Sequence, residues 1–143
     1  MEATDPTLSS TVPMAHAPTV ERVRELLGDA GFGVLTEIDL QATLLAKLGV
    51  DVPAQVILGA CRPELAYRAL ESSPWIATLL PCNVVITQVD AQHSRVEVFD
   101  IALLVRIAPD AEVMAVAAET RARLLGMMDA LSVEAGERHA VGA

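Results

Sequence analysis

Basic side chains are scarce in this sequence. Lysine occurs once, at Lys47, and nine arginines are spread along the chain, against 19 acidic residues and a net charge of −9. A protein that binds nucleic-acid phosphates needs clustered lysine and arginine, so we expect no nucleic-acid partner. The acidic balance also opposes attraction to an anionic membrane surface.

Aromatic residues and long apolar runs are scarce as well. Aromatics make up 3% of a chain that is 52% hydrophobic, so the core must be aliphatic. No stretch approaches the roughly 18 apolar residues of a membrane-spanning helix. The N-terminus has no basic or apolar segment of a secretory signal, and we therefore expect a cytoplasmic protein without a membrane partner.

Standard chemical motifs are absent. The chain has no GxGxxG dinucleotide loop, no phosphate-binding loop, and no HExxH, CxxC or GxSxG pattern. Its two cysteines, Cys61 and Cys82, are expected to be reduced in the cytoplasm. Their spacing matches no zinc finger, and a zinc site needs about four ligands. The three histidines are scattered, so a metal site would need ligands from a second subunit.

The length of 143 residues fits one domain without a second core. Residues 1–10 are polar and contain Pro6, which predicts a disordered leader. Residues 11–133 are expected to form the domain, and residues 134–143 a frayed tail.

Apolar periodicity predicts alternating strands and helices over the domain. Asp39 is placed to cap a helix whose apolar stripe ends before Gly49. The expected strands are residues 11–16, 33–38, 55–59, 82–89 and 95–100, the last open to extension toward residue 107, and the expected helices begin at Pro18, Leu40, Pro63 and Pro109. The pattern predicts an α+β fold: a single two-layer domain with a mostly antiparallel or mixed sheet and helices on one face.

Cys61 lies where an apolar strand meets the helix that Pro63 begins. A helix N-terminus presents free N–H groups and a partial positive charge, which favour the thiolate, and Arg62 would add to this effect. The alternative is a small apolar core residue, since free cysteine is often buried.

Cys82 opens the next strand, and neighbouring strands would bring it close to Cys61. Two thiols there could hold a soft metal or form a redox disulfide. For another ligand, the N–H groups after Cys61 and the side chains of Arg62 and Asn83 are natural polar contacts. The candidate ligand site is therefore Cys61, Arg62, Cys82 and Asn83, with Cys61 and Cys82 as candidate metal ligands and no catalytic residue assigned.

Four blocks of sequence together resemble a family known as domain of unknown function 302 (DUF302). The blocks are residues 31–39, 44–49, 58–66 and 79–84, and the resemblance spans roughly residues 12–130. It implies a compact α+β domain similar to dimeric members of that family. It implies no reaction, substrate or cofactor.

Three functions are compatible with these features. The first is a binding or regulatory module, homodimeric, with a small molecule or soft metal near Cys61 and Cys82 and a cofactor not identified. The second is a thiol enzyme or redox protein that uses Cys61 with Cys82 as partner, which the lack of a general base near either cysteine disfavours. The third is an oligomeric interaction protein without a chemical site, whose contact would be the apolar run 101–108 and the last helix.

Overall fold

Five antiparallel strands form one sheet in the order β1-β5-β4-β3-β2. The structure, a computed structural model, describes residues 5–107 and 110–142, the stretch 137–142 by its backbone alone. The strands are β1 Thr7–Val12, β2 Gly33–Asp39, β3 Gln55–Cys61, β4 Cys82–Asp90 and β5 His93–Phe99. The helices are α1 His16–Asp29, α2 Leu40–Leu48, α3 Pro63–Ser72 and α4 Ala111–Gly142, with 3-10 helices η1 Pro74–Leu79 and η2 Ile101–Arg106. The α+β prediction is confirmed.

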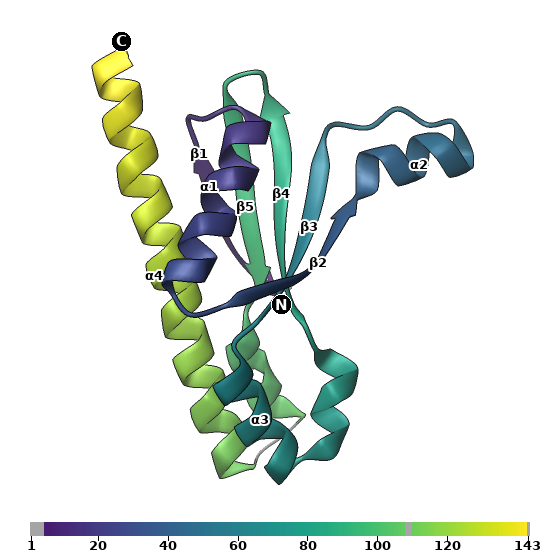
Figure 1. Cartoon of the computed structure of the whole chain (residues 1–143), viewed down its shortest axis with the longest axis vertical. Helices are drawn as coiled ribbons and strands as arrows, with labels where there is room; N and C mark the ends of the chain where they lie inside the picture. Colours follow the sequence, from purple (N-terminus) through teal and green to yellow (C-terminus); the bar gives the residue numbers. More distant parts are fainter. Residues whose placement is uncertain (1–4, 108–109, 143) are drawn as a thin grey trace.

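Helices α1 and α4 cover one face of the sheet (Figure 1). Strand side chains alternate between faces, so Leu58, Val84, Ile86 and Val96 all point into the layer beneath these helices and are fully buried. The opposite face, called here the open face, carries half-buried and exposed side chains. Among the described residues, no helix is long and apolar enough to cross a membrane.

A second, smaller apolar cluster lies beyond the end of the sheet. Helix α3, helix η1 and the first turns of α4 bury Leu65, Ala69, Ile76, Val113 and Val116 against one another. Figure 1 shows this lobe below the sheet, with α4 running the length of both parts. The expectation of a single core is therefore wrong, because α4 is long enough to serve two clusters.

Both ends of the domain are more ordered than the sequence predicts. Strand β1 begins at Thr7 and pairs with β5, so the expected leader 1–10 extends too far. At the other end, Glu134 accepts two hydrogen bonds from Arg22 at 2.6 and 2.7 Å, and Ala135 is buried. The described part of the expected frayed tail, residues 134–142, is thus helical, and it is docked on α1 where it begins.

Residues 101–106 form a 3-10 helix rather than an extension of the last strand. The carboxylate of Asp100 accepts the N–H of Ala102 at 3.1 Å and pairs with Arg121 at 2.8 Å. These contacts turn the chain back onto α4 and bury Leu104. The expected start of the last helix at Pro109 lies outside the described residues.

Helix α2 has the expected ends but not the expected packing. Asp39 accepts the N–H of Ala42 at 2.9 Å, and Gly49 adopts a left-handed φ of 67°. Its apolar stripe, however, is unburied: Leu45 is 55% and Leu48 69% exposed. Figure 1 shows α2 standing away from the sheet beyond β3.

Gly59 on β3 allows a close approach on the open face. A Cβ atom at this position would meet the hydroxyl of Thr36 and, at 2.8 Å, the ring of Pro81. Thr36 is the register partner of Gly59 on β2, and Pro81 directly precedes β4. The missing side chain therefore sets how β2 and the start of β4 flank β3.

We expect Gly59→Ala to lower the free energy of unfolding by about 1–3 kcal/mol, because the added methyl overpacks this contact. Gly28→Ala is the matched control, since nothing lies within 4 Å of a Cβ added there on α1. The control should be neutral or up to about 1 kcal/mol more stable. Denaturant unfolding measures both, and equal effects of the two variants would contradict the close approach.

Candidate functional site

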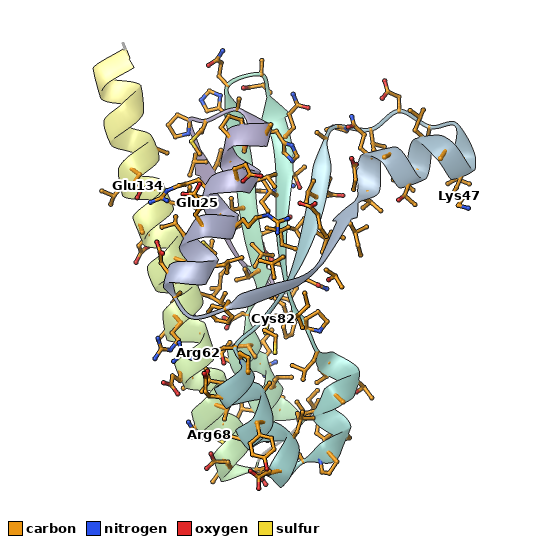
Figure 2. All side chains as sticks on the ribbon, viewed as in Figure 1. Glu25, Lys47, Arg62, Arg68, Cys82 and Glu134 are labelled. Carbon is orange, nitrogen blue, oxygen red and sulfur yellow. The ribbon has the colours of Figure 1, made fainter. Side chains whose placement is uncertain are left out.

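Cys61 and Cys82 lie on neighbouring strands where the sheet meets the lower lobe. Cys61 ends β3, Cys82 begins β4, and the register pairs Cys82 with Ala60, one residue before Cys61. Figure 2 shows Cys82 at this junction. Both thiols are free and half-buried.

A narrow apolar space, the inner cavity, separates the end of the sheet from the lobe. It has a volume of about 50 Å³. Both cysteines line it, together with Phe32, Leu65 and Val116 from the sheet edge, α3 and α4. The structure thus brings Cys61, Arg62 and Cys82 to one cavity.

A larger space, the outer pocket, lies on the other side of Cys82. Its volume is about 330 Å³, and its walls include Asn83, Phe99, Ile107 and Leu124. Both spaces share a wall formed by Leu79, Cys82, Ile101 and Leu104. Asn83 therefore joins the site through the outer pocket rather than beside Arg62.

Arg62 closes one side of the inner cavity. Its Nη1 donates to the carbonyl of Ala30 at 2.8 Å, and its Nε lies 3.6 Å from a carboxylate oxygen of Glu64. The guanidinium occupies the space where a Cβ at Gly31 would lie, and Gly31 has a φ of 88°. Arg62 thus ties the start of α3 to the turn after α1.

The thiols do not ionise as the helix terminus predicts. Burial raises the pKa of Cys61 above its ordinary value. Burial also raises the pKa of Cys82, and a negative charge on Cys61 would raise it further. Burial is the cause at Cys61, and Arg62, whose Nη1 donates to the carbonyl of Ala30, does not lower the pKa of this thiol.

Other metal-ligating side chains lie elsewhere. Nε2 of His16 is 2.9 Å from the carbonyl oxygen of Ile86, and Nδ1 of His93 is 2.8 Å from Asp90. The side chain of His139 lies outside the described residues. Over the described part of the chain, no group of three or more His, Cys, Asp or Glu side chains could hold a metal ion. A metal site on Cys61 and Cys82 stays a prediction.

Two residues of η2 that line the site, Ile101 and Leu104, were not identified from the sequence. An alternating strand pattern before them suggested a continued strand. The available signal was Asp100, whose side chain caps η2.

Comparison with known proteins places this fold among uncharacterised relatives. The family model described as "Domain of unknown function DUF302" matches residues 8–131. The chain is also similar to a crystal structure of an uncharacterized conserved protein DUF302 from Bacillus stearothermophilus, with a TM-score of 0.80 and 28% identity over 88% of this chain and 98% of that one. No curated protein matches this sequence.

We expect both thiols to react with iodoacetamide more slowly in the folded than in the unfolded protein at pH 8, because burial raises their pKa. A thiol with a raised folded pKa stabilises the fold below its unfolded pKa and loses this contribution as pH rises through the folded value. The free energy of unfolding should therefore fall from pH 8 to pH 10, and less steeply in Cys82→Ala. Faster alkylation of Cys61 in the folded than in the unfolded protein would contradict the raised pKa of this thiol.

Proposed function

The chain belongs to the DUF302 family, and we propose that it is a small binding module that takes up a small molecule between Cys61 and Cys82 and acts as a homodimer. One observation supports this ligand site: cysteines from two strands line an apolar cavity that adjoins a larger pocket. Binding sites are commonly apolar hollows with a few polar groups, here Arg62 and Asn83.

The lining favours binding over catalysis. Among the described residues, no histidine, aspartate or glutamate lines the inner cavity or the outer pocket. A nucleophilic thiol needs a base or a lowered pKa, and burial raises the pKa of both cysteines. Thiol enzyme and redox functions are therefore the weaker alternatives.

A soft metal is the second ligand class for the same site. It would have two thiolates, from Cys61 and Cys82, which suits Cu(I) better than zinc. Metal binding requires deprotonated thiols, which their raised pKa opposes. Metal analysis of untagged protein tests this version directly.

We assign the cytoplasm as the compartment because both cysteines are free and reducing conditions keep them so.

The dimer contact that fits best is the arm, defined here as β2, α2 and Val50. Leu35, Ile38, Leu45, Leu48 and Val50 are all exposed on it. Exposed apolar patches of this kind mark interaction surfaces. In the run 101–108, Leu104 is buried against the domain and Val105 and Ile107 are exposed, so this run offers fewer exposed apolar side chains than the arm.

We expect xenon to enter the pocket and shift the methyl NMR signals of Leu79 and Leu104, because dry apolar cavities bind xenon. Cys82→Ile should weaken these shifts, because its larger side chain narrows both spaces at the wall they share. Val85→Ile is the matched control, half-buried on the same strand but outside both linings. If xenon does not shift the methyl signals of the wild-type protein, the proposed pocket is wrong.

We expect Leu48→Glu to weaken self-association roughly tenfold or more in sedimentation, since a carboxylate buried without a partner is costly. Monomer stability should hardly change, because α2 has no buried residue. Val133→Glu is the control, a similarly exposed valine on α4. A wild-type protein that stays monomeric at high concentration would rule out the homodimer.

A further inference from the structure

The inner cavity and the outer pocket are adjacent apolar spaces that share part of their lining. The wall they share contains Cys82, and the two spaces extend from it in different directions, toward Phe32 and Leu65 on one side and toward Phe99 and Leu124 on the other.

The size of the space limits its occupant. The outer pocket alone holds about 330 Å³. An apolar cavity of about 150 Å³ accommodates benzene, so the outer pocket has room for roughly a dozen carbon atoms. The inner cavity, at about 50 Å³, has room for the end of such a chain only.

Most polar groups around this space already have partners. Thr120 donates to the carbonyl of Val116 at 2.8 Å, and Nη1 of Arg62 donates to the carbonyl of Ala30, although Nε of Arg62 is buried without a hydrogen-bond partner. The side chain of Asn83 differs: it is exposed and makes no hydrogen bond to any described residue. Its amide is thus available to one hydrogen-bonding group of a ligand.

The surroundings disfavour a negative charge on that ligand. Among the described residues, no lysine or arginine lines the outer pocket, so an anionic head beside Asn83 would have no cationic partner there. The burial that raises the pKa of both thiols would oppose any other buried anion in the same way.

We infer that the ligand is an uncharged molecule with an apolar chain of roughly a dozen carbon atoms and one hydrogen-bonding head, such as a long-chain alcohol. The chain lies in the outer pocket with its end passing Cys82 toward the inner cavity, and the head meets the amide of Asn83. This inference rests on the pocket proposed above and adds the class of its ligand.

The test compares 1-decanol with decanoate, which share a chain and differ in charge, by calorimetry and methyl NMR at pH 7.5. We expect 1-decanol to bind and decanoate to bind at least about tenfold more weakly, because a carboxylate beside Asn83 would lie against apolar walls without a cationic partner. Asn83→Leu should weaken 1-decanol binding about two- to tenfold, the range of one neutral hydrogen bond. Gln92→Leu, which removes an amide from the β4–β5 turn, should leave binding unchanged.

The outcomes separate the two proposals. If xenon enters but decanoate binds as tightly as 1-decanol, the pocket stands and the uncharged class is wrong. If xenon enters and neither chain binds, the ligand class is again wrong. If Asn83→Leu and Gln92→Leu behave alike, the head contact is wrong. If neither xenon nor any chain shifts the lining methyls, the pocket itself is wrong.

Discussion

The missing side chain at Gly59 is the constraint on which the site depends. Thr36 and Pro81 both occupy the space over this residue, so β2 and the start of β4 are held close to β3. Because Cys82 follows Pro81 directly, the same contact fixes Cys82 beside Ala60 and next to Cys61. The chain leaves β3 toward α3 and enters β4 from η1. The lobe and its cavities form at this end of the two strands.

Local signals account for most of the fold that the sequence predicted. Asp39 and Gly49 delimit α2, and Gly31 ends α1, because capping depends on a few adjacent residues. The exposed face of α2 was not predictable in this way, and at η2 the strand pattern before it concealed the local signal of Asp100. Apolar periodicity shows that a face is apolar, but not whether anything in the same chain covers it.

The proximity of Cys61 and Cys82 was predictable from strand order, whereas their chemistry was not. A helix N-terminus suggested a reactive thiolate, but burial outweighs it and Arg62 is engaged with Ala30. A lining of aliphatic side chains and thiols with raised pKa supports the proposed binding module. The same raised pKa weakens a metal site on the two cysteines.

The most direct test of this account is the location of bound 1-decanol by intermolecular NOEs. The account predicts contacts from the alkyl chain to methyl groups of Leu79, Ile101 and Leu104, which line both spaces. Contacts confined to the exposed leucines of α2, Leu45 and Leu48, would contradict it, because the molecule would then bind the arm and not the pocket.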